Sequence, residues 1–258
     1  MKGFDIVLFL PSFVGTTMIA LVHLLLPRFG FIHKPGNAWV PASAGVAMSY
    51  VFMDIFPHLA KSHAKLLNTA GSDLYSFLTH HVYLMALVGF AVYLGVVLLA
   101  KNIRKSRTGS EIKVTSAPLI LHIGLASLVG YNFLIGYLLS EQPTHHTKAM
   151  VLLGLAMAIH IAGIDLVMRD YITRPYDRFA GIIFAVAVYA GWLAGAITEI
   201  ADASLLLLYS FLAGGLIVIA TIYELPRIQS YRQYGAFLAG CLVFSIIVLA
   251  VEYVMWIG

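Results

Sequence analysis

The stretch SLLLLYSFLAGGLIVIATIYEL occupies residues 204–225 and contains a single charged side chain, that of Glu224. A helix needs ~20 predominantly apolar residues to cross the hydrocarbon core of a bilayer. This stretch therefore predicts a transmembrane helix, and the rest of the sequence can be searched for runs of the same kind.

The whole chain shares this apolar character. Of its 258 residues, 60% are hydrophobic and 11% are charged, and the mean hydropathy is +0.89. Soluble domains are roughly 45–50% apolar and about 25% charged, so a soluble globular class is excluded. The single cysteine, Cys241, has no partner for an internal disulfide. We expect residues 1–258 to form one polytopic all-α domain in the lipid bilayer, with no separate soluble domain.

Long apolar runs predict eight transmembrane helices. The first run is not followed by a signal-peptide cleavage pattern, so we count it as a span. The second run contains Asp54 and has Pro57 near its end. The predicted spans cover residues 5–26, 39–60, 75–100, 114–139, 149–168, 180–200, 204–225 and 234–256, each to within a few residues.

The distribution of Lys and Arg predicts how these helices are oriented. Twelve of the 16 cationic residues lie in the connections after spans one, three, five and seven, and four lie on the opposite side. Cytoplasmic loops attract positive charge, so both termini are expected on the non-cytoplasmic side. The basic pI of about 9.1 is then a consequence of topology, and no nucleic-acid partner is expected.

Two of the predicted spans match each other in sequence. Residues 44–57 read AGVAMSYVFMDIFP and residues 213–226 read AGGLIVIATIYELP. In an eight-span topology these segments run in opposite directions. Related elements of opposite direction are typical of inverted-repeat transporters, whose substrate sites lie near the bilayer midplane. We expect a 3+2+3 arrangement, with spans one to three and six to eight as the repeats and spans four and five between them.

Four segments resemble the ZIP (Zrt-/Irt-like) family of divalent-metal transporters. Residues 44–58 are similar to the second span of the family, with Asp54 at its histidine position and His58 at its glutamate position, and residues 210–226 are similar to its seventh span. Residues 131–136 (YNFLIG) resemble its H-N-x-x-D/E-G motif, and residues 160–164 (HIAGI) resemble H-E-x-P-E.

The two motifs in spans four and five depart from the family pattern. Asn132 and Gly136 match, whereas Tyr131 replaces the histidine and Ile135 the acid; in span five only His160 is retained. The resemblance implies a ZIP-like fold with a degenerate metal site. It implies transport of a divalent cation through that weakened site, or a ZIP-fold membrane protein without metal transport.

The polar groups inside spans four and five are candidate ligands in their own right. Ionisable residues within a membrane are costly to insert and are functional hypotheses by default. An imidazole such as that of His160 suits zinc-like metals, and Asn132, Tyr131 and Asp165 offer oxygen. His160 and Asp165 are five positions apart, or about 140° around a helix, so they cannot both point directly at one ion. We expect a weak, transient metal site in a polar pocket between spans four and five.

The sequence leaves other interpretations of these residues open. His160 suits an interhelical hydrogen bond to Tyr131 or Asn132 equally well. Asp165 could pair with Arg169 near the inner headgroups, and His23 and Glu224 lie near inner helix ends, where side chains snorkel to water.

Two further features concern the outer surface and helix packing. Glu199, Asp54 and His58 fall near outer ends and are predicted to form a vestibule that attracts cations. Small residues spaced four apart, at Gly191/Gly195, Gly235/Ala239 and Ala236/Gly240, suit internal packing or a homodimer contact.

Motifs of the common enzyme classes are absent from the sequence. There is no Walker-type loop, no H-E-x-x-H and no G-x-S-x-G, and no nucleophile–base pair can be assembled. We therefore expect no enzyme activity and no permanently bound cofactor, with Zn, Fe, Mn or Cd ions as the candidate substrates. The alternative is a sensor, a scaffold or a carrier of an uncharged solute.

Overall fold

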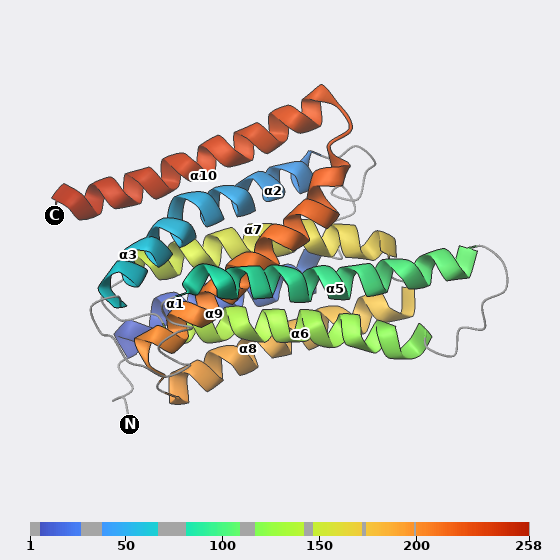
Figure 1. The fold of residues 1–258 in the computed structure, drawn as a ribbon, viewed down its shortest axis with the longest axis horizontal. Helices are drawn as coiled ribbons and strands as arrows, with labels where there is room; N and C mark the ends of the chain where they lie inside the picture. Colours follow the sequence, from blue (N-terminus) through green and yellow to red (C-terminus); the bar gives the residue numbers. More distant parts are fainter. Residues whose placement is uncertain are drawn as a thin grey trace.

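The protein is all-helical in a computed structural model that describes residues 6–26, 38–66, 81–108, 117–141, 147–171, 174–198 and 200–257. The chain passes back and forth along the long axis of the molecule, and α1 begins at the same end at which α10 finishes (Figure 1). The elements are α1 (Ile6–Leu25), α2 (Trp39–Tyr50), the π-helical turn η3 (Val51–Ile55), α3 (Phe56–Leu66), α5 (Val82–Thr108), α6 (Ala117–Glu141), α7 (Thr147–Tyr171), α8 (Arg174–Ile197), α9 (Asp202–Ile219), the π-helical turn η5 (Ala220–Glu224), the 3-10 turn η6 (Leu225–Arg227) and α10 (Tyr231–Ile257).

Several of these helices have the length and composition of membrane spans. Within the described residues, six segments are long and apolar enough to cross a bilayer: Trp39–Lys61, Ile123–Glu141, Met150–Val167, Phe179–Ile197, Asp202–Arg227 and Tyr231–Tyr253. Two more apolar segments, Leu10–Leu25 and Val82–Leu98, are shorter over that part of the chain. The protein is an all-α, multipass membrane protein, as the sequence predicted.

The second span was predicted at residues 39–60, and Trp39–Lys61 has the length and composition of a membrane span. Helix continues through Pro57 as far as Leu66. Proline lacks an N–H group and its ring crowds the preceding helical turn. Here a wider π-helical turn comes directly before it, in which the Phe56 N–H bonds the carbonyl of Val51. The wider turn accommodates the proline, so the helix does not end there.

The second π-helical turn lies at the equivalent position of residues 213–226, the segment whose sequence matches residues 44–57. Val51 comes seven residues after Ala44, and Ala220, which opens η5, comes seven residues after Ala213. In η5 the Leu225 N–H bonds the carbonyl of Ala220, the counterpart of the bond in η3. The two segments therefore share a local backbone irregularity as well as sequence.

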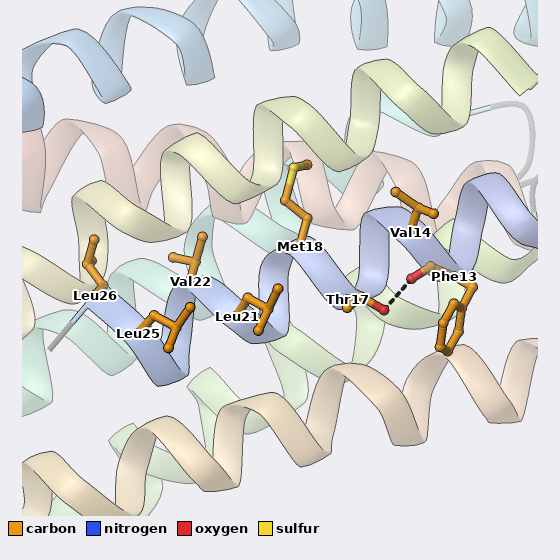
Figure 2. Close-up of a pocket in the computed structure, with 8 residues that line it drawn as sticks. All are labelled: Phe13, Val14, Thr17, Met18, Leu21, Val22, Leu25 and Leu26. Carbon is orange, nitrogen blue, oxygen red and sulfur yellow. Dashed lines mark hydrogen bonds between the residues drawn. The ribbon is translucent and has the colours of Figure 1, made fainter. Parts of the chain in front are cut away.

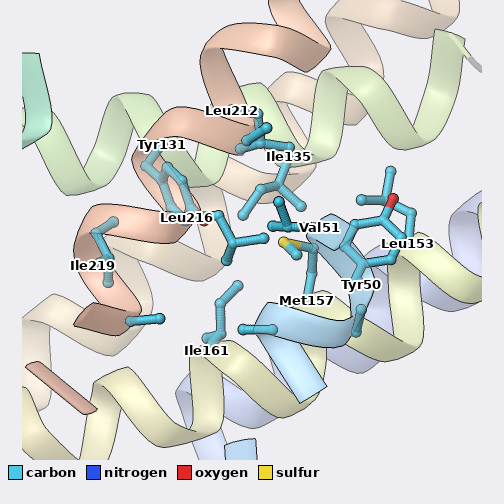
Figure 3. Close-up of a cluster of buried hydrophobic side chains, with 14 of the residues drawn as sticks. Tyr50, Val51, Tyr131, Ile135, Leu153, Met157, Ile161, Leu212, Leu216 and Ile219 are labelled. Atoms are coloured by element: carbon cyan, nitrogen blue, oxygen red, sulfur yellow. The ribbon is translucent and has the colours of Figure 1, made fainter. Parts of the chain in front are cut away.

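The helices associate in pairs around a buried core. The closest pairs are α6 with α8, α5 with α9, α2 with α10 and α1 with α7, and α7 also packs against α2 and η5. Tyr50, Tyr131, Met157 and Leu216 are among the largest fully buried side chains and lie together in the middle of this core (Figure 3). Because α7 contacts α1 on one side and α2 with η5 on another, its polar residues meet different neighbours.

Some of the predicted small-residue positions make contacts within the chain. Gly191 and Gly195 of α8 both pack against the backbone of α6, and Gly240 of α10 packs against the backbone of Ala42 on α2. Gly235 and Ala239 are exposed. The G-x-x-x-G pattern in α8 therefore serves close helix packing within the chain.

Candidate functional site

Two groups of buried polar side chains lie on different sides of α7. The first, called here the His160 cluster, consists of His160, Gly163, Glu224 and Ser43. The second, called the His23 cluster, consists of His23, Asp165 and Asn132. The five-residue spacing of His160 and Asp165 turns their side chains by about 140°, which places one toward α2 and η5 and the other toward α1.

The His160 cluster is a chain of short polar contacts between three elements. His160 Nδ1 lies 3.1 Å from Oε2 of Glu224, and both side chains are fully buried. Ser43 Oγ lies 2.9 Å from the other carboxyl oxygen of Glu224 and 2.8 Å from the carbonyl of Val40. Both oxygens of the Glu224 carboxyl group are thus engaged, one by α7 and the other by α2.

One nitrogen of His160 remains unused. With the shared hydrogen on Nδ1, a neutral imidazole has its lone pair on Nε2. Nε2 is buried and has no hydrogen-bond partner among the described residues. Such an unsatisfied buried polar atom is rare and calls for an explanation, such as a ligand or water.

Gly163 makes this cluster sterically possible. A Cβ atom at position 163 would overlap Oγ of Ser43 and Oε1 of Glu224. The absence of a side chain lets the Ser43–Glu224 pair sit directly against the α7 backbone, one turn from His160. The position of Glu224 also depends on η5, because Glu224 is the last residue of that π-helical turn.

The His23 cluster uses both nitrogens of its imidazole. His23 Nδ1 lies 2.8 Å from Oδ2 of Asp165, and Nε2 lies 2.8 Å from Oδ1 of Asn132. The Asn132 amide nitrogen donates to the carbonyl of Leu128 at 2.9 Å, and the ring of Phe184 covers His23 with a centroid distance of 5.3 Å. His23 and Asn132 are only 2% and 3% exposed, and the Asp165 side chain is 12% exposed.

These contacts differ from the predicted grouping of ligands. Asn132 and Asp165 come together through His23, whereas His160 bonds Glu224, which in turn bonds Ser43, instead of Tyr131 or Asn132. Tyr131 packs its ring against Tyr93 at a centroid distance of 5.4 Å, and its buried hydroxyl has no hydrogen-bond partner in the described part of the chain.

The interior between α6, α7 and α9 is apolar in this conformation. Ile135, Met157 and Leu216 fill the space that the sequence analysis expected to hold a polar pocket (Figure 3). The difference arises because α6 packs mainly on α8 and α7 mainly on α1 and α2, so their polar residues face those neighbours.

Sequence reasoning misjudged His23 and Glu224. Both lie near helix ends and were expected to snorkel, yet they are 2% and 0% exposed. Neighbouring helices cover those ends, so the side chains bond across the core instead. Asp165 pairs with His23, and the side chain of Arg169, its predicted partner, lies outside the described residues. The sequence could have indicated His23 and Glu224 as interior site residues because both are ionisable and lie within predicted spans. It offered no comparable signal for Ser43.

The structure describes two of the three residues that were predicted to form the outer vestibule. Asp54 in η3 is half-buried and interacts electrostatically with Tyr50 and Tyr209. His58 in α3 is exposed, with its ring centroid 6.4 Å from that of Tyr209. Both residues therefore lie beside Tyr209. Glu199 lies outside the described residues.

A hollow of about 570 Å³ follows α1 from Phe13 to Leu26. Its lining side chains are apolar except for Thr17, whose hydroxyl bonds the carbonyl of Phe13 on its own helix (Figure 2). Several of them, including Val14 and Leu21, are exposed on the outside of the bundle. This hollow offers no ligand for a cation and fits contact with lipid.

A preformed polydentate metal centre is absent from the described ranges, in which no three His, Cys, Asp or Glu residues converge. What the geometry offers is one imidazole with a free nitrogen, one fully engaged imidazole, and two carboxyl groups that hold them.

A scan of the sequence against models of known protein families finds no match, and a comparison with curated proteins finds none either.

Proposed function

We propose that this protein is a membrane carrier of ZIP-like design that moves a divalent metal cation, with Nε2 of His160 as its principal protein ligand. The proposal has two parts, an inverted-repeat architecture and a metal-binding histidine. In the proposed architecture the chain has eight spans, both termini lie on the non-cytoplasmic side, and α6 and α7 lie between the two repeats.

The matched segments support the inverted repeat. The helices that carry them, α2 and α9, run in opposite directions along the bundle (Figure 1). Each segment contains a π-helical turn at the same distance from its Ala-Gly start. π-Helical turns are rare in proteins, so finding two in register by chance is improbable. Where they occur, they often lie at functional sites.

Close glycine contacts support the same relation. In each matched segment, the glycine of the Ala-Gly pair packs against the backbone of a neighbouring helix, which is α10 for α2 and α5 for α9. A glycine of that neighbouring helix in turn packs against the residue two positions before the Ala-Gly pair. The contacts are Gly45 with Phe237 and Gly240 with Ala42 between α2 and α10, and Gly214 with Ala86 and Gly89 with Phe211 between α9 and α5. Two helix pairs with the same internal register are what an inverted repeat requires, and such repeats underlie alternating access in many carriers.

The single observation that carries the metal assignment is the free Nε2 of His160. A histidine that binds a metal through one nitrogen commonly donates its other N–H group to a carboxyl or carbonyl oxygen, which fixes its tautomer and orientation. His160 is held in this way by Glu224, which is itself held by Ser43. Nothing in a merely structural hydrogen bond requires that the second nitrogen be left without a partner.

The binding should be weak. Stable zinc sites use four ligands, and catalytic sites use three with water. Here one imidazole nitrogen is in place, and the buried Tyr131 hydroxyl and water are the remaining candidates. A carrier must also release its substrate, so a site completed only transiently, while apolar side chains move aside, is consistent with transport.

Uptake of metal into proteoliposomes tests the proposal. Vesicles that contain a trapped fluorescent chelator are mixed with Zn²⁺, Fe²⁺, Mn²⁺ or Cd²⁺. We expect uptake above that of protein-free vesicles, and a loss of about tenfold or more in His160→Ala. Ser49→Ala is the matched control, because Ser49 is also a buried polar residue of α2 but bonds Cys241 and Ser245 of α10. No uptake by the wild type, or equal uptake by His160→Ala, contradicts the proposal.

The apolar surroundings of His160 favour a second candidate, a ZIP-fold protein that does not transport metal. Ile161 and Ile164 are buried beside it, and a bare ion would find few oxygen atoms on its path. A sensor, a scaffold or a carrier of an uncharged solute would have these features. Calorimetric titration of the purified protein with the same four ions separates a metal-binding protein from a scaffold or a carrier of an uncharged solute, since only a metal-binding protein should give heat that His160→Ala removes. The uptake assay then separates a metal carrier from a metal sensor.

A further inference from the structure

The orientation of the Asn132 amide determines the protonation of His23. The Asn132 amide nitrogen donates to the carbonyl of Leu128, so its oxygen faces His23 Nε2 at 2.8 Å. The opposite amide orientation would place two carbonyl oxygens against each other. Because an amide oxygen only accepts hydrogen bonds, Nε2 of His23 must carry a proton.

The contact on the other side of the ring requires a second proton. His23 Nδ1 and Asp165 Oδ2 are 2.8 Å apart, a hydrogen-bond distance that two lone pairs would not tolerate. One proton therefore lies between them, on Nδ1 of an imidazolium that faces a carboxylate, or on Oδ2 of a carboxylic acid that faces a neutral imidazole. In either form the pair holds the same number of protons and is neutral overall.

Removal of that proton would be unfavourable in this conformation. It would leave a net negative charge on a pair whose side chains are 2% and 12% exposed, and it would break the contact between them. Burial of an unpaired charge is strongly unfavourable. The neighbouring elements offer no substitute: α6 contributes the Asn132 amide, α8 the Phe184 ring, and among the described side chains Asp165 of α7 is the titratable group that acts on His23.

We infer that the His23 cluster is a proton-binding site, which holds one proton between His23 and Asp165 in the described conformation and releases it to water when α1 and α7 separate. The released proton leaves behind a neutral imidazole and a carboxylate, so the pair changes from net neutral to a single negative charge. Residues of three helices, α1, α6 and α7, form this site, so movement of any one of them disrupts it.

The position of the cluster links it to transport, and this link rests on the proposed function. Asp165 lies on the same helix as His160, about 7.5 Å farther along it. A displacement of α7 that opens His160 toward water also changes the distance between Asp165 and His23. A metal carrier built in this way would exchange protons as it moves its cation.

The linkage can be measured in vesicles of phosphatidylcholine and phosphatidylglycerol with a trapped pH-sensitive dye and Mn²⁺ as the probe. In the wild type, Mn²⁺ uptake should be accompanied by a change of internal pH. Asp165→Asn and His23→Gln should each abolish the pH change, while Ser49→Ala should retain it. Wild-type Mn²⁺ uptake without any pH change would overturn the coupling.

A second measurement needs no transport and separates this inference from the proposed function. Infrared difference spectra of the metal-free protein in nanodiscs, recorded between acidic and alkaline pH, should contain a signal from carboxyl and imidazole protonation. We expect Asp165→Asn and His23→Gln each to remove that signal and His160→Gln to leave it. A wild-type spectrum identical to those of both variants would overturn the proton site. If the signal behaves as expected while no metal moves, the proton site stands and the metal carrier fails. Should Asp165→Asn not fold, His23→Gln decides the result alone.

Discussion

The His160 and His23 clusters each contain an imidazole and a carboxyl group but use their imidazoles differently. Each combines a histidine, a carboxyl group and a third polar side chain in the buried core. His23 has acceptors on both ring nitrogens, whereas His160 has one on Nδ1 and none on Nε2 among the described residues. A histidine with a free nitrogen is suited to bind a metal ion, and one with both nitrogens engaged is suited to hold a proton. The same pair of functional groups, an imidazole and a carboxyl group, thus acquires different chemistry according to whether the second ring nitrogen has a partner.

The strongest disruption of the His160 cluster should come from Gly163→Ala. The new Cβ would overlap the polar atoms of Ser43 and Glu224, and because those atoms belong to two other elements, α7 would be forced away from both. Overpacking of a well-packed interior is destabilising by about 1–3 kcal/mol, and we expect about 3 kcal/mol here because hydrogen bonds are also lost. The measurement is equilibrium unfolding with sodium dodecyl sulfate in detergent micelles.

Gly130→Ala is the matched control for this change. Gly130 lies in α6, and a Cβ atom there meets nothing within 4 Å. Replacement of an exposed helical glycine by alanine should leave stability unchanged or raise it by up to about 1 kcal/mol. If the two variants were equally stable, Gly163 would not hold the cluster together.

Glu224→Gln tests whether the carboxyl group supports a metal ligand. The glutamine can still accept from His160 Nδ1, but it lacks the negative charge that makes the imidazole a better donor to metal. Loss of such a supporting carboxylate typically weakens metal binding about 10–100-fold. Calorimetric titration with Cd²⁺ should show this loss for Glu224→Gln, and Asp165→Asn should bind Cd²⁺ like the wild type. Equal weakening in both variants would mean that the two clusters are not chemically distinct.

Asp165→Ala should affect stability and leave metal affinity unchanged. It removes the acceptor for His23 Nδ1, which has no other partner in the described structure. A buried polar atom left unsatisfied is destabilising by about 1–3 kcal/mol, so we expect about 2 kcal/mol in the same unfolding assay. An unchanged unfolding midpoint would show that water replaces Asp165 and that the cluster is less closed than its burial suggests.

The sequence could predict the helices because their signal is long and local. An apolar run such as residues 204–225 can satisfy its backbone within the bilayer only as a helix, whatever its neighbours are. The repeated segments at 44–57 and 213–226 were also visible. Their π-helical turns were not, because a π-helical turn depends on how neighbouring helices pack and has no composition of its own.

The polar contacts could be predicted only in part, because they depend on which helices become neighbours. The sequence identified His160, Asn132 and Asp165 as interior polar groups, and their spacing showed that His160 and Asp165 face different ways. It could not show that α1 brings His23 between Asn132 and Asp165, or that η5 brings Glu224 to His160. A residue near a helix end snorkels only if that end is uncovered, and coverage is a property of the whole bundle.

The smallest expected effect, that of Ser43→Ala, separates stability from function most cleanly. Ser43 bonds Glu224 in the His160 cluster, and Ser49, two turns farther along the same span, bonds Cys241 and Ser245 at the α10 contact. Interhelical hydrogen bonds in membranes contribute about 0.6–1.7 kcal/mol, so Ser43→Ala and Ser49→Ala should destabilise the protein by a similar amount, about 1 kcal/mol each. Their effects on Cd²⁺ affinity should differ, because only Ser43 holds the carboxyl group that orients His160. A lower affinity in Ser43→Ala alone would show that the free nitrogen of His160 is positioned for metal, whereas equal affinities would reduce the cluster to a packing contact.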